Sequence, residues 1–191
     1  MKKKDMKYKA IVIGVSAGGL EALKKILPEL PADFPVPVIV IQHRHPFSDE
    51  SLEKAMDDQC RVKVEQINDK TSIKPGYVYF APPNYHVMIE EDMTFSLTLD
   101  PAVNFSRPSI DVLFESAAET FGNKLIGIVL TGANKDGSEG LAQIKKKGGL
   151  AIVQDPDTAE VDVMPLSAIA TTKVDYILKL ELIAEMLVKI V

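Results

Sequence analysis

The sequence predicts an α/β fold: a doubly wound, mostly parallel sheet with helices on both faces and a small antiparallel β insertion. Short runs of β-branched residues alternate with segments of helical period, and this alternation is typical of βαβ units. Some runs, such as residues 36–42 and 125–130, are apolar almost throughout, as strands covered on both faces are. Between them the period shortens over residues 71–99, which predicts closely spaced antiparallel strands.

The first half of the chain predicts three strands before the insertion, at residues 9–14, 36–42 and 62–66. Leucine and isoleucine at helical spacing follow the first strand until Pro28, which ends the helix because proline lacks the N–H that a helix interior needs. Residues 51–58 predict a short second helix. The insertion is expected to contain strands at 76–80, 85–89 and 95–99, with a turn at 90–92.

In the second half, an apolar stripe with spacing i, i+3, i+4, i+7, i+8 and i+11 runs from Ile110 to Phe121 and predicts a helix packed on the sheet. Buried strands at 125–130 and 150–154 are expected to flank a helix at 139–147, which Gly148-Gly149 ends. The last expected elements are a short helix after Pro165, a strand at 176–178 and a helix from residue 181.

Composition narrows the class of protein. The 191 residues are 46% hydrophobic and 26% charged, so we expect one domain over residues 1–191 with a basic tail at residues 1–8. No apolar run reaches the roughly 18 residues of a membrane span, and no signal peptide is recognisable, so a cytoplasmic location is expected. A net charge of -5 argues against nucleic-acid binding. Cys60 is the only cysteine, and no metal-binding motif occurs, so we expect no disulfide, no metal and no cofactor.

Three unusual loops follow predicted strands, at the edge where parallel α/β sheets bind ligands. The first loop matches G-x-S-x-G, in which small neighbours allow a sharp strand-to-helix turn that exposes Ser16. Backbone N–H groups near Ala17 could there stabilise an oxyanion. His43 in the second loop can accept the Ser16 proton, and Asp136 in the third can orient the His43 imidazole. The sequence therefore predicts nucleophilic catalysis by a Ser-His-Asp set.

Each of these residues also has another interpretation. The glycine-rich first loop is a loose variant of the dinucleotide-binding G-x-G-x-x-G, although Gln42-His43 stand where an acidic ribose-binding residue would be expected. His43 could be a buried structural histidine, and Asp136 could cap the helix that follows it. The chain order Ser, His, Asp also differs from the order in the common α/β-hydrolases, which disfavours that superfamily.

A set of motifs extends over almost the whole chain. They are GVSAGG at 14–19, QH at 42–43, KPGYVYFAPP at 74–83, RPSIDVLFES at 107–116, LTG at 130–132 with DG at 136–137, GG at 148–149, QD at 154–155 and MP at 164–165. In this order they resemble the catalytic domain of the chemotaxis protein-glutamate methylesterases, the CheB family. Any one block is weak evidence, but the ordered set is highly specific.

The resemblance implies a serine esterase that hydrolyses γ-glutamyl methyl esters on methyl-accepting chemotaxis receptors, releasing methanol. Members commonly also deamidate particular receptor glutamines. The family's nucleophile, base and orienting acid fall on Ser16, His43 and Asp136. The implied partners are cytoplasmic receptor helices, without nucleic acid and without membrane insertion.

Departures from the family pattern surround these residues. Ala133 and Asn134 stand where members usually have methionine and glycine, so substrate fit near Asp136 is expected to differ. We keep Ala17, Ala133 and Arg107 as candidates for oxyanion or substrate contacts, Arg107 alternatively for shaping the cleft. The loop with Glu160 and Asp162 adds acidic charge, which could weaken docking to acidic receptor helices or select another partner.

The resemblance covers only part of the architecture of two-domain members, which carry an N-terminal phosphorylatable receiver domain. Only a short segment precedes the first predicted strand here, so we expect a stand-alone methylesterase, with any regulation coming from a separate protein. The alternatives are a catalytically silent binding module in a sensory complex and a nucleotide-binding α/β domain. The nucleotide-binding domain would bind a dinucleotide and be indifferent to loss of His43.

Overall fold

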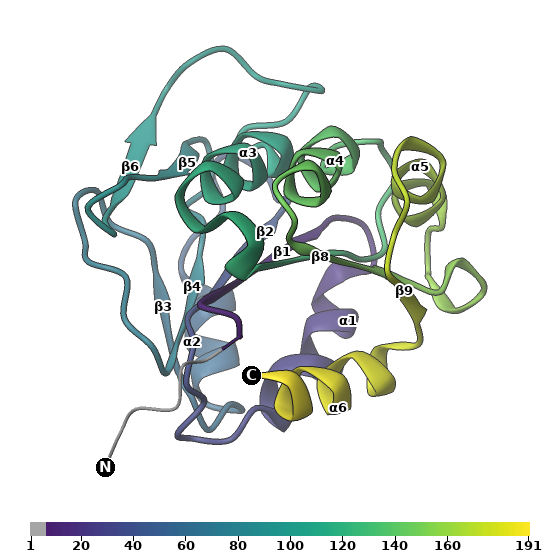
Figure 1. Ribbon diagram of the computed structural model, residues 1–191. Helices are drawn as coiled ribbons and strands as arrows, with labels where there is room; N and C mark the ends of the chain where they lie inside the picture. The colour runs from purple at the N-terminus through teal and green to yellow at the C-terminus, as the bar shows by residue number, and fades with distance from the viewer. Residues whose placement is uncertain (1–6) are drawn as a thin grey trace.

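Seven parallel strands form one sheet in the computed structural model, which describes residues 7–191. The strands are β1 (Ala10–Val15), β2 (Val38–Gln42), β3 (Lys63–Gln66), β4 (Tyr77–Phe80), β7 (Leu125–Val129), β8 (Leu150–Gln154) and β9 (Tyr176–Leu178). Their order across the sheet is β3-β4-β2-β1-β7-β8-β9, and each neighbouring pair is parallel (Figure 1). The predicted doubly wound sheet is confirmed.

Helices cover both faces of this sheet. They are α1 (Gly19–Ile26), α2 (Ser51–Asp57), α3 (Ile110–Phe121), α4 (Ser138–Lys146), α5 (Val163–Thr171) and α6 (Leu180–Ile190), with single 3-10 turns at Leu27–Glu29, Gly122–Lys124 and Pro156–Thr158. Helices α1, α2 and α6 bury their apolar sides on one face, and α3, α4 and α5 on the other (Figure 1). Strand β1 serves both cores, because successive side chains point to opposite faces: Ile11 and Ile13 belong to one cluster and Ala10 and Val12 to the other.

The order in which strands are added to the sheet reverses at β1: the chain first extends the sheet on the β2 side and later on the β7 side. Strand β2 pairs with one side of β1, with Val15 opposite Gln42, and β7 pairs with the other, with Gly14 opposite Val129. In open parallel sheets a crevice forms at such a point, outside the carboxyl ends of the strands. The loops that follow β1, β2 and β7 therefore meet at one place, and these are the three loops that the sequence singles out.

The prediction for residues 76–80 was wrong in its pairing. These residues form β4, which lies between β2 and β3 in the parallel sheet, and they take no part in an antiparallel insertion. Strand β4 has both faces covered, with Val78 and Phe80 in one core and Tyr79 in the other. The antiparallel insertion is smaller than expected and consists of β5 (His86–Ile89) and β6 (Phe95–Thr98), which packs on the α3 side.

Prolines explain two shifted boundaries. Strand β2 begins at Val38, two residues later than predicted, since Pro37 has no N–H; its carbonyl still accepts from the Ile11 N–H at 3.0 Å. Helix α5 begins at Val163, before Pro165, because the first helical turn has no use for the missing N–H. Gly148, in the left-handed conformation (φ 85°), ends α4 as predicted, and its N–H donates to the Lys145 carbonyl at 3.0 Å.

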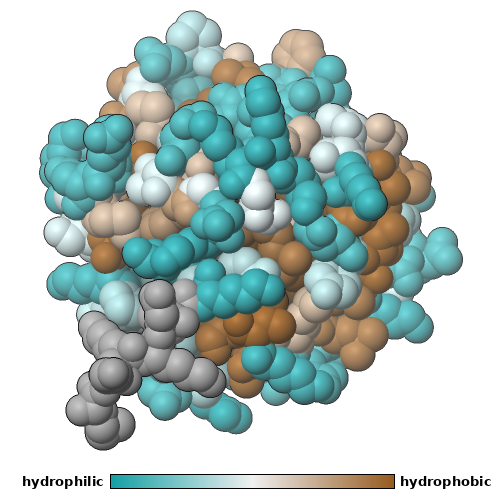
Figure 2. All heavy atoms as spheres, in the orientation of Figure 1, coloured by the Kyte–Doolittle hydropathy of each residue, from teal (hydrophilic) through white to brown (hydrophobic). Residues whose placement is uncertain are grey.

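The predicted basic tail at residues 1–8 lies mostly outside the described residues. At its end, Tyr8 is buried in the core on the α1 side, and the Lys9 N–H donates to the Lys124 carbonyl at 2.8 Å. The surface is mainly hydrophilic on the face seen in Figure 2, with hydrophobic side chains gathered toward β9 and α6. Within residues 7–191, no helix has both the length and the apolar character to cross a bilayer.

Candidate active site

Ser16 lies on the sharp turn between β1 and α1. Gly18 adopts a left-handed conformation (φ 76°), and the Ser16 N–H donates to the Thr131 carbonyl at 3.0 Å, which fixes the turn against the loop after β7. Gly14 has no room for a side chain, because an added Cβ would lie 2.3 Å from the Ile110 Cγ2 atom. The glycine of the elbow thus lets the start of α3 approach the serine loop.

His43 directly follows β2, and its N–H donates to the Val15 carbonyl at 3.0 Å. The Gln42 side chain joins the first two loops, since its amide nitrogen donates to the Ser16 carbonyl at 3.0 Å and to the His43 carbonyl at 2.8 Å. A side chain at Gly19 would collide with Gln42, because an added Cβ would lie 2.2 Å from the Gln42 Oε1 atom. The small residues after Ser16 therefore leave room for the Gln42 side chain between the two loops.

Asp136 is fully buried and caps the N-terminus of α3, not the helix that follows it. Its Oδ2 accepts from the Ile110 N–H at 2.6 Å, and its Oδ1 accepts from the Ser109 hydroxyl at 2.8 Å and the Asp111 N–H at 3.2 Å. The positive end of the α3 dipole favours a carboxylate at this place. The capping interpretation was thus correct in kind and wrong about which helix is capped.

The same carboxylate holds His43. The Nε2 atom of His43 lies 2.9 Å from Asp136 Oδ2, with 12% of the histidine side chain exposed. Burial raises the pKa of Asp136, but the hydrogen bonds from His43, the Ile110 N–H and the Ser109 hydroxyl outweigh it, so the pKa lies below its ordinary value. Asp136 is therefore ionised and accepts from Nε2, which leaves Nδ1 of His43 as the basic nitrogen.

Asn134 faces that basic nitrogen. The Asp136 N–H donates to Asn134 Oδ1 at 3.1 Å, which turns the amide nitrogen toward His43 Nδ1, at 3.5 Å, and toward the Ser106 hydroxyl, at 3.4 Å. An amide donor at this place favours the histidine tautomer with Nδ1 unprotonated. The departure at residue 134 thus acts directly on the candidate base.

These side chains border an open cleft of about 360 Å³. Ser16, His43 and Asn134 line it on the side of the sheet, and Phe105 and Arg107 line it on the side of the loop between β6 and α3. A hydroxyl, an imidazole held by a buried carboxylate and space for a substrate are the parts that acyl transfer through a serine requires. A larger hollow between α1 and α6, about 590 Å³, is lined by lysine, glutamate, alanine and valine and contains no serine, cysteine or histidine.

Comparison with known proteins decides which family has this arrangement. Residues 11–187 match the family model described as CheB methylesterase. The chain belongs to the CheB methylesterase family. The resemblance predicted from the ordered motifs is therefore confirmed.

Individual relatives of this CheB-family chain agree in sequence and fold. A Leptospira interrogans protein named for methylesterase and glutaminase activity is 55% identical over 185 residues, which are 97% of this chain and 96% of that protein. The Thermotoga maritima protein-glutamate methylesterase/protein-glutamine glutaminase is 37% identical over 186 residues, which are 96% of this chain and 54% of the relative. The crystal structure of the Thermotoga maritima CheB methylesterase catalytic domain matches with a TM-score of 0.93 and 36% identity, covering 96% of this chain and 99% of that one.

The other predicted site residues of this CheB-family chain lie at different distances from the cleft. The peptide that carries the Ala17 N–H is held through its carbonyl, Ser16 O, by Gln42 and by the Gly19 N–H at 2.9 Å. A trans peptide fixed in this way presents its N–H on the side opposite to that carbonyl. Ala17 is itself not among the residues that line the cleft. Ala133 is exposed and is not among the residues that line the cleft.

Arg107 lines the cleft, but its guanidinium is bonded to neighbouring loop segments. It donates to Asn84 Oδ1 at 2.8 Å and to the carbonyls of Leu99 and Asp100 at 2.8 and 3.1 Å. These contacts favour the cleft-shaping role over direct substrate contact.

Three positioning residues of the CheB-family site were missed from the sequence. Gln42 joins the Ser16 and His43 loops; Thr131 donates through its hydroxyl to the Ala17 carbonyl at 2.8 Å; and Asn104 donates to Asp136 Oδ1 at 3.2 Å. Gln42 and Thr131 stood inside the singled-out motifs, so their place was visible although their bonds were not. Nothing in the sequence pointed to Asn104, which reaches across from a different loop.

Two further groups fall outside the cleft chemistry. His86, which the sequence leaves unassigned, is buried and bonded on both ring nitrogens, to the Pro101 carbonyl at 3.1 Å and the Ser109 N–H at 3.2 Å. Burial raises the pKa of the Cys60 thiol to about 11, which leaves it a poor nucleophile. Residues 7–191 contain no group of three or more histidine, cysteine, aspartate or glutamate side chains placed to hold a metal ion.

Proposed function

We propose that this protein hydrolyses glutamate γ-methyl esters on the cytoplasmic helices of methyl-accepting chemotaxis receptors, and that it acts in the cytoplasm. The observation that carries the proposal is the buried, ionised Asp136 bonded to His43 Nε2 beside Ser16, in an open cleft of a CheB-family chain. Deamidation of receptor glutamines uses the same chemistry, with ammonia in place of methanol as the leaving group.

The reaction proceeds in two acyl-transfer steps. Ser16 Oγ attacks the ester carbonyl while His43 Nδ1 accepts the hydroxyl proton, and the tetrahedral oxyanion lies against the Ala17 N–H. The carbon–oxygen bond to the methoxy group breaks, and the imidazolium gives its proton to that oxygen, so methanol leaves and a γ-glutamyl ester of Ser16 remains. Water then attacks this ester with His43 as base, which releases the glutamate carboxyl group and restores Ser16.

Asp136 stabilises the imidazolium that forms in each step and stays ionised itself. Its place at the N-terminus of α3 supports this, because four donors besides His43 lie within 3.2 Å and stabilise the negative charge. No step of this mechanism uses a metal or an organic cofactor, so a chelator is expected to leave the rate unchanged.

The test is methanol release from methylated chemoreceptor membranes by the purified protein, with Ser16→Ala as the paired control. We expect release by the wild type and loss of nearly all of it in the variant, with an unchanged melting temperature because Ser16 lies on the cleft surface. If well-folded wild type releases no methanol from receptors of the same source, the proposal is overturned and the silent binding module is favoured. A dinucleotide that raises the melting temperature, together with full function after His43→Ala, would instead favour the nucleotide-binding alternative.

A further inference from the structure

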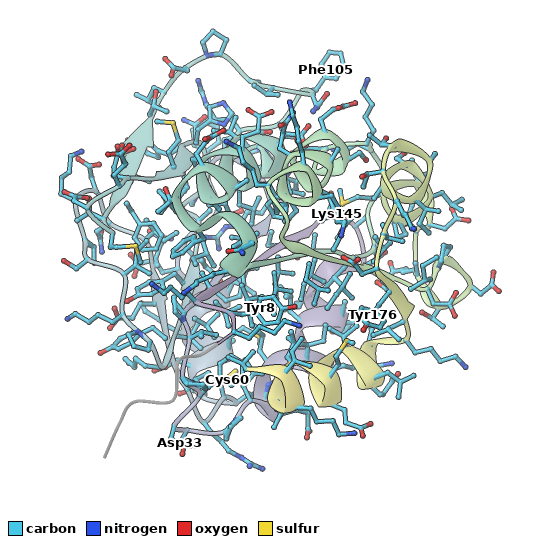
Figure 3. The ribbon with its side chains drawn as sticks, viewed as in Figure 1. Tyr8, Asp33, Cys60, Phe105, Lys145 and Tyr176 are labelled. Carbon is cyan, nitrogen blue, oxygen red and sulfur yellow. The ribbon has the colours of Figure 1, made fainter. Side chains whose placement is uncertain are left out.

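We propose that Phe105 is a docking anchor for the protein substrate, packing its ring on an apolar side chain of the helix that carries the methylated glutamate. This inference rests on the proposed function and adds a specificity residue that the catalytic set does not contain. Its starting point is exposure: the Phe105 ring is fully exposed, at the tip of the loop between β6 and α3, away from the body of the fold (Figure 3). Large aromatic residues left in solvent beside a cleft are typical of interaction sites.

The backbone at Phe105 is an unfavourable one for phenylalanine. The N–H groups of Val103 and Ser106 each donate to the other residue's carbonyl, at 3.1 and 2.9 Å, so Asn104 and Phe105 form a two-residue turn. Both turn residues have positive φ, 50° at Asn104 and 61° at Phe105. Tight turns of this kind prefer asparagine followed by glycine, and a bulky side chain at the second position is strained. Nothing within the fold gains from the ring, which suggests that its role lies outside the fold.

The turn is held rigidly against the catalytic residues. Asn104 donates to Asp111 Oδ2 at 2.7 Å and to Asp136 Oδ1 at 3.2 Å, so the residue before Phe105 is tied to the carboxylate that orients His43. On the other side, Arg107 anchors the loop through Asn84 and the Leu99 carbonyl. A rigid aromatic side chain binds at a small entropic cost, because little freedom is lost on contact.

The position of the ring matches a protein substrate and not a small ester. Phe105 lines the same cleft as Ser16 and His43, so a helix that inserts its glutamate ester there passes the ring. Side chains three or four positions away on a helix lie about 5–6 Å apart, so the neighbour one turn from the ester is within reach of the rim. Phe47, 90% exposed in the loop after β2, extends the apolar rim beyond Pro46, which also lines the cleft. A small ester has no neighbouring helix side chain that could pack on either ring.

The decisive variant is Phe105→Gly, because it should separate folding from function. Glycine relieves the left-handed backbone, so we expect the melting temperature to stay the same or rise by a few degrees. The kcat/KM for methanol release from methylated receptors should fall about tenfold or more, mainly through KM, as when an interface hot spot is truncated. Hydrolysis of p-nitrophenyl acetate, which has no neighbouring side chain that could reach the ring, should fall by a clearly smaller factor than hydrolysis of the receptor ester. Phe105→Leu, which keeps an apolar side chain, should retain most of the receptor activity.

Tyr176→Ala is the matched control, since Tyr176 is an exposed aromatic residue on β9, an edge strand that β8 separates from the strands carrying the catalytic loops. It should change neither substrate's kinetics. Wild-type receptor kinetics in Phe105→Gly would overturn the anchor while leaving the proposed function standing. Equal losses on receptor and small ester would also overturn it, because they would assign the turn to positioning of Asp136. If the wild type releases no methanol in a Ser16-dependent way, the proposed function is overturned first, and the anchor with it.

Discussion

Asp136 serves two purposes with one carboxylate: it caps α3 and orients His43. It accepts five hydrogen bonds, from His43, Asn104, the Ser109 hydroxyl and two backbone N–H groups. The sequence predicted that Ser16, His43 and Asp136 share one edge of the sheet, because each follows a parallel strand; in the structure His43 is bonded to Asp136 and lines one cleft with Ser16. It could not predict Gln42 or Asn104 as their supports, because hydrogen bonds between loops leave no periodic signal.

Asp136→Asn should therefore reduce both activity and stability. The amide keeps only one acceptor oxygen, so it loses either the two bonds at the Oδ2 position, from His43 and the Ile110 N–H, or the three at the Oδ1 position. A buried donor left without a partner costs about 1–3 kcal/mol. We expect kcat to fall by a factor on the order of a thousand or more, since the histidine tautomer is no longer set. Urea unfolding and esterase assays should show both losses in this variant but only the activity loss in Ser16→Ala. An unchanged unfolding midpoint would contradict the capping role.

Asn134 offers a second test at the residue scale, because its amide nitrogen faces His43 Nδ1. In Asn134→Asp a carboxylate would accept a hydrogen bond from a protonated Nδ1 and so favour ring forms that cannot take the Ser16 proton. Esterase activity at pH 7 should follow the order wild type, Asn134→Ala, Asn134→Asp, with the aspartate variant about tenfold or more below wild type, or roughly 1.4 kcal/mol of transition-state stabilisation. Its deficit should shrink as the pH rises. An aspartate variant as active as the alanine variant would show that the contact at 3.5 Å has no influence on the base.

At the scale of elements, α3 brings a second buried carboxylate to the site. Asp111, in its first turn, accepts from the Gly140 N–H at 2.7 Å and from Asn104. The stripe from Ile110 to Phe121 predicted this helix with its bounds, because packing on a sheet imposes the helical period. The same reasoning failed for β4: a four-residue strand has too little pattern to show whether it pairs in parallel or antiparallel.

Asp111 should make stability depend on pH in an unusual direction. Burial, reinforced by the charge of Asp136, raises the pKa of Asp111 to about 6. Between its ordinary value and about 6, the native state keeps a proton that the unfolded chain has lost, so this group's contribution to the free energy of unfolding falls as the pH rises through that window. Asp136, whose pKa is lowered, acts in the opposite direction, but only below its ordinary value.

Urea unfolding of wild type and Asp111→Asn at pH 5 and pH 7.5 measures this effect. The free energy of unfolding of wild type, relative to that of the variant, should be higher at pH 5 than at pH 7.5, because only the wild type gains from holding the proton. Loss of the hydrogen bond to Asn104 lowers the free energy of unfolding of the variant equally at both pH values, so it cancels when the two pH values are compared. Parallel pH dependence of the two proteins would rule out titration of Asp111 in this range.

At the scale of the whole molecule, the cleft lies between surfaces of different character. Exposed aromatic rings lie at Phe105, which lines the cleft, and at Phe47 in the loop after β2, whereas the loop with Glu160 and Asp162 lies near the Ser16 elbow. Glu160 leans on that elbow, its Cβ only 2.6 Å from where a Gly18 Cβ would be. The sequence predicted acidic charge near the site, and the contact explains how: the Val161 carbonyl accepts from the Gly132 N–H at 3.0 Å, which ties this loop to the one after β7.

Glu160→Gln should consequently improve the use of an acidic receptor substrate. Removing one negative charge beside the cleft reduces repulsion during docking, so kcat/KM for receptor methyl ester should rise about threefold at low ionic strength. The gain should vanish near 0.5 M salt, where the screening length falls to about 4 Å, and it should be absent for a neutral small ester at any salt concentration. Asp33→Asn, the same charge change at the far end of the molecule from Phe105, is the control and should have no effect (Figure 3). A gain that persists at high salt would mean that Glu160 acts by shaping the elbow around Gly18, whereas a gain shared by the Asp33 variant would mean that net charge alone governs docking.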